Sequence, residues 1–161
     1  MDVSSLGYKA ETRYLIPHER IQQERVDALK KRMKRDDKQK RPIIVFRIGN
    51  KLLILDGHHR AAALEDLGYP SVYVMEIGFY LSNFIMVDSW NRDKVHDKTE
   101  IIQRALAGKL YESKDTRHWV RLNEDGWETF HKHEKLAPEV NIHLRKLKHP
   151  EIMPPPPMRL I

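Results

Sequence analysis

Cysteine is absent from this chain of 161 residues, and that absence restricts its chemistry at once. Disulfide bonds, thiolate metal sites and catalysis by a thiol are all excluded. Long apolar runs are lacking too, since no stretch approaches the length of a membrane span and the N-terminus has no apolar signal-peptide core. We therefore expect a soluble, cytoplasmic protein that does not associate with a membrane.

Hydrophobic residues make up 40% of the chain and charged residues 32%, which is the composition of a soluble globular protein. The length is enough for one compact domain with a real core. The polar segment 1–13 predicts a flexible lead-in, and we place a single domain at 14–150. Residues 151–161 form a proline-rich tail that cannot build a core.

The net charge of +6 is moderate, but its distribution is uneven. Eight cations fall within the twelve residues from Lys30 to Arg41. Such a run could contact nucleic acid. It could also be the solvated end of a helix, where cations suit the helix dipole, followed by a loop. Aromatic residues and a helix-turn-helix pattern are missing from the run, so we favour the solvated surface.

Apolar spacing and turn residues predict alternating strands and helices. We expect strands at 13–16, 42–48, 51–55, 71–77 and 81–87, with Gly49-Asn50 as a hairpin turn. We expect one helix that begins at Pro17, further helices at 61–67 and 98–107, and a weak helix near 138–147. This mixture in one short chain predicts an α+β (mixed α/β) domain.

The segment Asp56–Arg60 stands directly between a predicted strand and a predicted alanine-rich helix. Each residue has an ordinary explanation: Asp56 as a helix N-cap, Arg60 as a surface charge, the histidines as polar turn residues. All of these together, with no spacer between strand and helix, point instead to a functional site.

The residue types of this turn suit a phosphate group. The first turn of a helix leaves backbone N–H groups unpaired and carries partial positive charge, so it attracts anions. A glycine lets the backbone bend and a ligand approach closely. Asp56 is suited to a metal ion or to a hydroxyl proton. The predicted phosphate-binding residues are Gly57, His58, His59 and Arg60.

The Asp-Gly-His-His-Arg turn and its helix resemble the ParB/sulfiredoxin superfamily, and within it the branch of the free serine kinases. The resemblance implies a ParB/sulfiredoxin-like domain with a mixed sheet flanked by helices. Sulfiredoxin uses a cysteine in this turn, which this chain lacks. Chromosome-partitioning ParB proteins usually carry Glu-Arg-Arg where this chain has His58-His59-Arg60, which argues against that branch.

Glu19 follows Pro17 and His18 at the predicted start of a helix. An acid in a first helical turn is favourable to the dipole and needs no further role. The free serine kinases, however, carry a His-Glu pair after a proline at this place. The resemblance implies that Glu19 is the base that takes the proton of the substrate hydroxyl.

A second cluster of phosphate-type donors follows about fifty residues after the first. A threonine hydroxyl, a guanidinium and an imidazole in a row can hold one tetrahedral anion, although an ordinary polar loop would look the same. The serine kinases carry a similar Thr-Arg-His segment, which implies that Thr116, Arg117 and His118 bind the phosphorylated product. Trp90 falls where that family places a tryptophan near its amino-acid substrate.

Two functions follow from these patterns. The first is a kinase that transfers phosphate from ADP or ATP, with Mg²⁺ held by Asp56, to a small hydroxyl compound; the resemblance implies L-serine, giving O-phosphoserine. Glu19 and Asp56 are its catalytic residues. The second is a ParB-like nucleotide- or DNA-binding module without transfer activity. The sequence leaves open the preferred nucleotide (ADP, ATP or CTP) and the oligomeric state.

Overall fold

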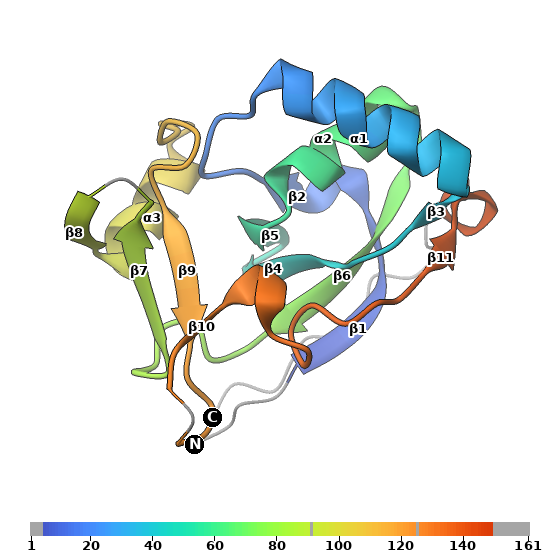
Figure 1. Ribbon diagram of the computed structural model, residues 1–161. Helices are drawn as coiled ribbons and strands as arrows, with labels where there is room; N and C mark the ends of the chain where they lie inside the picture. The colour runs from blue at the N-terminus through green and yellow to red at the C-terminus, as the bar shows by residue number, and fades with distance from the viewer. Residues whose placement is uncertain (1–4, 91, 125, 150–161) are drawn as a thin grey trace.

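The computed structural model describes residues 5–90, 92–124 and 126–149 of the chain. Two β-sheets pack against each other, and helices cover the larger sheet on its other face (Figure 1). The predicted α+β class with a mixed sheet flanked by helices is therefore confirmed. None of the helices in the described residues is long and apolar enough to cross a membrane.

The larger sheet has five strands in the order β1-β6-β4-β5-β2. Its pairs β1–β6 and β4–β5 are antiparallel, whereas β4–β6 and β2–β5 are parallel. The strands are β1 (Ser5–Glu11), β2 (Leu15–Ile16), β4 (Ile43–Ile48), β5 (Lys51–Asp56) and β6 (Ser71–Ile77).

Side chains alternate between the two faces of this sheet, and each face has its own core. Helices α1 (Gln23–Asp36) and α2 (His58–Asp66) pack on one face, where Val26 and Leu64 meet Val45. On the other face Ile44 belongs to a second core cluster together with Val87 of the smaller sheet. Burying apolar area on both faces is the main favourable term in folding, so β4 and β5 are held rigidly in the middle of the protein.

The smaller sheet is antiparallel, with strand order β10-β9-β7-β8. Its strands are β7 (Ile85–Ser89), β8 (Arg92–His96), β9 (Arg117–Val120) and β10 (Glu128–Thr129). Helix α3 (Lys98–Leu106) follows β8 and is capped by the Asp97 side chain, which accepts a hydrogen bond from the Thr99 N–H at 2.9 Å.

The remaining elements are short. Strands β3 (Lys38–Gln39) and β11 (Ile142–His143) pair with each other. Three 3₁₀ helices complete the described chain: η1 (Thr12–Tyr14), η2 (Phe130–Lys132) and η3 (Leu144–Leu147). The predicted weak helix near 138–147 is wrong, because this stretch forms β11 and then η3.

The predicted flexible lead-in at 1–13 is also wrong over its described part. Residues 5–11 form β1, which pairs with β6 along its whole length. Only Ala10 is buried in this edge strand. Backbone pairing therefore orders a segment whose side chains give no apolar alternation. The proline-rich tail at 151–161 lies outside the described residues.

Two predicted starts differ from the structure by four residues or more. The strand expected at 81–87 is β7, which begins at Ile85, and Leu81 is exposed. The helix expected to begin at Pro17 begins at Gln23. The segment before it is extended, because the Arg20 N–H donates to the Tyr111 carbonyl and the Tyr111 N–H donates to the His18 carbonyl, each at 2.8 Å.

Candidate active site

The Asp56–Arg60 segment links the end of β5 to the start of α2, as the sequence predicts. Gly57 has a φ of +103°, a backbone conformation that other residues rarely adopt. A Cβ at this position would lie 2.9 Å from Arg60 Nη2 and 3.2 Å from Ile43 Cγ1. Glycine is therefore required here both by the turn and by the close approach of its neighbours.

The two histidines of this turn are acceptors rather than cations. His58 Nε2 accepts a hydrogen bond from the His18 backbone N–H at 3.2 Å, and His59 Nε2 accepts from the Gln22 N–H at 3.0 Å. A ring nitrogen that accepts carries no proton. Burial lowers the pKa of His58 well below its usual value and that of His59 to about 4. Through these two hydrogen bonds the imidazoles hold the segment that carries Glu19.

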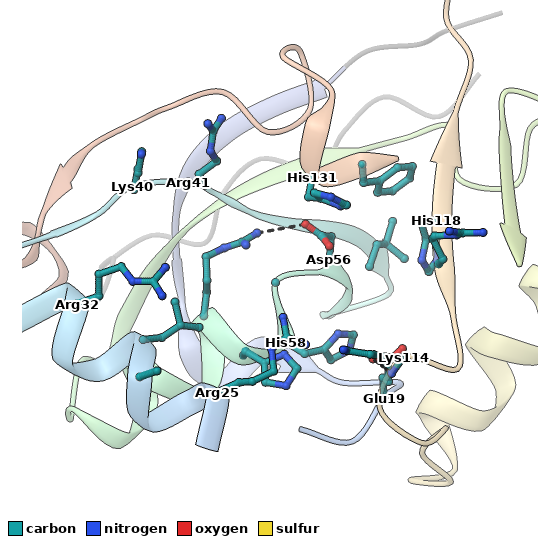
Figure 2. A pocket seen from close by; sticks show the side chains of 18 of the residues that line it. Glu19, Arg25, Arg32, Lys40, Arg41, Asp56, His58, Lys114, His118 and His131 are labelled. Atoms are coloured by element: carbon teal, nitrogen blue, oxygen red, sulfur yellow. Dashed lines mark hydrogen bonds and ion pairs between the residues drawn. The ribbon is translucent and has the colours of Figure 1, made fainter. Parts of the chain in front are cut away.

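Arg60 is the cation of the turn, and its guanidinium is fixed by the protein. Nη2 donates to the Pro42 carbonyl at 2.9 Å. It also donates to Asp56 Oδ2 at 3.2 Å, the contact drawn as a dashed line at Asp56 in Figure 2. Its buried Nε has no hydrogen-bond partner within the described part of the chain. A fixed guanidinium beside the N–H groups of a first helical turn is well suited to phosphate oxygens.

The sequence predicted that Glu19 lies in the first turn of a helix, and this is wrong. Glu19 lies four residues before the start of α1. Its carboxylate accepts hydrogen bonds from the Lys114 N–H at 2.9 Å, the Thr116 N–H at 3.3 Å and the Thr116 hydroxyl at 2.5 Å. Burial raises the pKa of Glu19, although these three hydrogen bonds oppose the rise. A partly buried carboxylate with a raised pKa is typical of a general base.

The two predicted clusters meet through His18, which is fully buried. The His18 ring centroid lies 4.6 Å from that of His58 and 5.4 Å from that of His118. Residues far apart in the sequence are thus brought to one place. His118 is itself buried, its Nε2 lies 3.0 Å from the Tyr80 hydroxyl, and burial lowers its pKa well below the usual value.

Arg117 is held by three neighbours. Its Nε and Nη2 each lie 2.9 Å from an oxygen of Asp88, and its guanidinium carbon lies 4.8 Å from the Trp90 ring and 4.7 Å from the Trp119 ring. Although partial burial opposes it, hydrogen bonds from Arg117 and Trp119 lower the pKa of Asp88, so this carboxyl stays charged. Trp90 is 43% exposed and thus serves as an open face beside a fixed cation.

A cleft of about 850 Å³ runs between these groups. Figure 2 shows Arg32, Lys40 and Arg41 along one side of it and Glu19, Lys114 and His118 at the other. Every predicted site residue lines this cleft. Those residues are Glu19, Asp56, Gly57, His58, His59, Arg60, Trp90, Thr116, Arg117 and His118.

Sequence reasoning missed several lining residues. Arg25 and Arg32 project from α1, Lys114 precedes the Thr116 segment, and His131 lies 6.1 Å from the Trp90 ring, centroid to centroid. Arg25 and Arg32 could have been predicted to line the cleft, because they follow Glu19 closely in the sequence. Nothing in the sequence indicates that His131 lies at this cleft. Among the described residues, no three histidine, aspartate or glutamate side chains lie close enough together to hold a metal ion. The prediction of a metal site therefore depends on Asp56 alone.

Relatives of known name share part of this sequence. An "ATP-dependent L-serine kinase" of Staphylothermus marinus is 36% identical over 78 residues, which cover 47% of this chain and 31% of that protein. A "ParB-like protein" of Sulfolobus acidocaldarius is 34% identical over 104 residues, covering 59% and 48%. The chain thus spans less than half the length of these curated relatives. No family model matches it.

Solved structures share the fold over nearly the whole chain. A free serine kinase in complex with AMP superimposes with a TM-score of 0.70 at 15% identity, covering 91% of this chain and 95% of that one. Truncated SbnI from Staphylococcus aureus gives a TM-score of 0.64 at 14% identity, covering 90% of each chain. The predicted resemblance is confirmed: the chain has sequence relatives named L-serine kinase and ParB-like protein, and it has the ParB/sulfiredoxin-like fold of the free serine kinases.

Proposed function

We propose that this protein is a small-molecule kinase that transfers phosphate from ATP or ADP to the hydroxyl of a free amino acid, L-serine, giving O-phosphoserine. One observation carries the proposal. The carboxylate of Glu19, the first turn of α2 and the Thr116–His118 segment come from three distant parts of the chain and line one cleft. A kinase needs a base and two phosphate positions together, and this cleft contains residues suited to each.

The nucleotide phosphates lie on the first turn of α2, against its N–H groups and the Arg60 guanidinium. Asp56 is the residue that would hold Mg²⁺. It fits, because Mg²⁺ is usually bound through one or two carboxylates together with substrate phosphates, and Asp56 is a partly exposed carboxylate in the cleft. The ion would neutralise charge on the phosphate oxygens.

The acceptor hydroxyl lies between this turn and Glu19. Its oxygen attacks the terminal phosphorus, the bond from that phosphorus to the nucleotide oxygen breaks, and the hydroxyl proton passes to Glu19. Thr116, Arg117 and His118 bind the transferred phosphoryl group, and Trp90 contacts the amino acid. Phosphoryl transfer depends mainly on positioning and on positive charge around the phosphoryl oxygens, which the fixed Arg60 and Arg117 supply.

A ParB-like nucleotide- or DNA-binding module is the second candidate, and one observation favours it. Four cations of the 30–41 run, namely Arg32, Lys38, Lys40 and Arg41, line the same cleft. A binding module, however, has no need of a partly buried carboxylate that lines the cleft and is held by three donors. We therefore rank the kinase first.

The test is a product assay. The protein is incubated with Mg²⁺ and ATP, ADP or CTP, each with L-serine, L-threonine, L-homoserine or glycerol, and products are followed by ³¹P NMR and mass spectrometry. O-phosphoserine should accumulate with ATP or ADP and should be absent without an acceptor. Nucleotide binding with no phosphorylated product from any acceptor would contradict the kinase and favour the binding module.

A further inference from the structure

A chain of three hydrogen bonds runs behind the cleft. His18 Nδ1 lies 2.7 Å from the Ile54 carbonyl oxygen, His18 Nε2 lies 2.9 Å from Thr116 Oγ1, and Thr116 Oγ1 lies 2.5 Å from Glu19 Oε2. His18 is 0% exposed and is not among the residues that line the cleft. It therefore reaches the chemistry only through Thr116.

The protons in this chain can be assigned from donor and acceptor types. A carbonyl oxygen only accepts, so His18 Nδ1 carries a proton. Burial lowers the pKa of His18 to about 4, so near neutral pH its Nε2 is a bare acceptor. Thr116 Oγ1 has one proton, and both His18 Nε2 and the Glu19 carboxylate lie within hydrogen-bond distance of it.

When Glu19 is ionised, these hydrogen-bond contacts therefore share one proton fewer than they need. The Thr116 hydroxyl can donate to the carboxylate or to His18, and whichever contact it leaves brings two acceptors together. A buried acceptor without a donor costs free energy. If Glu19 takes up a proton, it donates to Thr116 Oγ1, the Thr116 hydroxyl donates to His18 Nε2, and His18 Nδ1 donates to Ile54. Every contact is then satisfied.

We infer that His18 is a positioning residue that, acting through the Thr116 hydroxyl, prepares Glu19 to accept the proton of the acceptor hydroxyl. The inference rests on the proposed function, in which Glu19 is the base. The proton goes to Glu19 rather than to His18, because burial disfavours the charged imidazolium and the neighbouring His96 adds repulsion, although Asp56 acts in the opposite direction.

Other groups also act on Glu19, but none of them acts through the Thr116 hydroxyl. The N–H groups of Lys114 and Thr116 favour the ionised carboxylate, and the charge of Asp115 disfavours it. Of the residues hydrogen-bonded in this chain, His18 alone offers a bare acceptor that competes with Glu19 for the Thr116 hydroxyl proton.

Three variants test the inference. In His18→Phe the competing acceptor is gone, so Thr116 donates to Glu19 alone and the pKa of Glu19 falls. In Thr116→Val the carboxylate loses a donor and the pKa rises. In His18→Gln the amide can still donate to Ile54 and accept from Thr116, so the pKa stays close to that of the wild type. We expect opposite shifts of about one unit for Phe and Val.

The pKa of Glu19 is read from ¹³C NMR titration of side-chain carboxyls, assigned with Glu19→Gln, and so needs no enzyme activity. Circular dichroism and nucleotide binding confirm that each variant is folded. In the active enzyme, the acidic limb of the kcat profile should move down in pH for His18→Phe and return in His18→Gln, with the nucleotide KM unchanged.

The two ideas can fail separately. Opposite NMR shifts without any phosphorylated product would overturn the kinase but keep the hydrogen-bond chain. Product formation with the same Glu19 pKa in wild type, His18→Phe and Thr116→Val would overturn the role of His18. A His18→Phe protein that does not fold leaves the decision to Thr116→Val, where an unchanged or lowered pKa contradicts the inference.

Discussion

The carboxylate of Glu19 accepts hydrogen bonds from both the backbone N–H and the hydroxyl of Thr116, 97 positions further along the chain. This contact connects the extended segment before α1 to the loop before β9. Glu19 is thereby fixed between the Asp56–Arg60 turn and the Thr116–His118 segment. Its orientation depends on tertiary structure rather than on the helix that follows it.

Replacing Glu19 with Gln should stop turnover and leave nucleotide binding in place. A positioned base contributes on the order of 10²–10⁴ in rate, and the substitution keeps the size while removing the charge. Calorimetry of ADP binding and steady-state kinetics measure the two effects. Glu112→Gln is the matched control, since the Glu112 side chain is 80% exposed and pairs with Arg20 on the surface. Turnover near the wild-type rate in Glu19→Gln would show that the carboxylate only orders the Thr116 loop.

Gly57→Ala should lose both stability and nucleotide affinity. The left-handed backbone costs a non-glycine residue about 1–3 kcal/mol, and the added Cβ would push on the Arg60 guanidinium at 2.9 Å. Gly108→Ala separates the two effects, because Gly108 has a φ of +71° but nothing within 4 Å of an added Cβ. Urea unfolding should show a loss in both variants, whereas the affinity for ADP should fall only in Gly57→Ala. Equal affinities would mean that the turn does not hold the phosphates.

The course of the chain near this turn was largely predictable from sequence. The apolar run 51–55, the hairpin turn at Gly49-Asn50 and the alanine-rich helix each follow from local preferences, and all three are present. Local chemistry also fixes Gly57, since only glycine suits its backbone. The strand β1 could not be predicted in this way, because an edge strand with one buried side chain has no apolar pattern.

The state of the site residues needed the structure. The sequence places His58 and His59 in the predicted phosphate site, but only the structure shows that their Nε2 atoms accept backbone hydrogen bonds. The sequence names Arg117 as a candidate ligand of the phosphorylated product, but it does not reveal that Asp88 and two tryptophans hold its guanidinium. Protonation and orientation depend on neighbours that are distant in sequence, so residue types alone do not reveal them.

Arg117→Lys should weaken the binding of O-phosphoserine at least tenfold, or about 1.4 kcal/mol, and leave ADP binding unchanged. Lysine cannot form the paired contacts with Asp88 or stack between two indoles, so the cation would lose its fixed position. Calorimetry with each ligand measures both affinities. Arg121→Lys, an exposed site just after β9, is the control. A parallel loss of ADP affinity would place Arg117 in the nucleotide site instead.

The basic run from Lys30 to Arg41 is mostly exposed, as the sequence predicted, but its cations are not equivalent. Arg32 lines the cleft, whereas Lys34 on the same helix does not. Arg32→Ala should therefore lower the affinity for ADP by several-fold at low salt, and Lys34→Ala should not, because the field of a cation at a cleft acts on bound phosphate. Filter binding should detect only weak association with nucleic acid that falls steeply with salt. A tight, sequence-selective complex at physiological salt would favour the ParB-like module.

The last prediction concerns acid stability. The pKa of His18 in the folded protein is about 4, below its ordinary value of 6.5, so the unfolded chain binds this proton first as the pH falls. Stability from His18 is therefore fully present above about pH 6.5, decreases between 6.5 and 4, and changes no further below 4. The loss is on the order of 3 kcal/mol at 1.36 kcal/mol per pKa unit.

The raised pKa of Glu19 works in the opposite direction, so wild type must be compared with His18→Gln, which keeps the contacts of Glu19 but has no imidazole. Urea unfolding at roughly pH 7.5, 6, 5 and 4.5, a range that spans this window, should show a shallower decline in His18→Gln than in wild type. The control His143→Gln, at an exposed site of β11, should decline as the wild type does. Identical declines in all three proteins would show that folding does not lower the pKa of His18, and would remove this support for the bare Nε2 acceptor at the Thr116 contact.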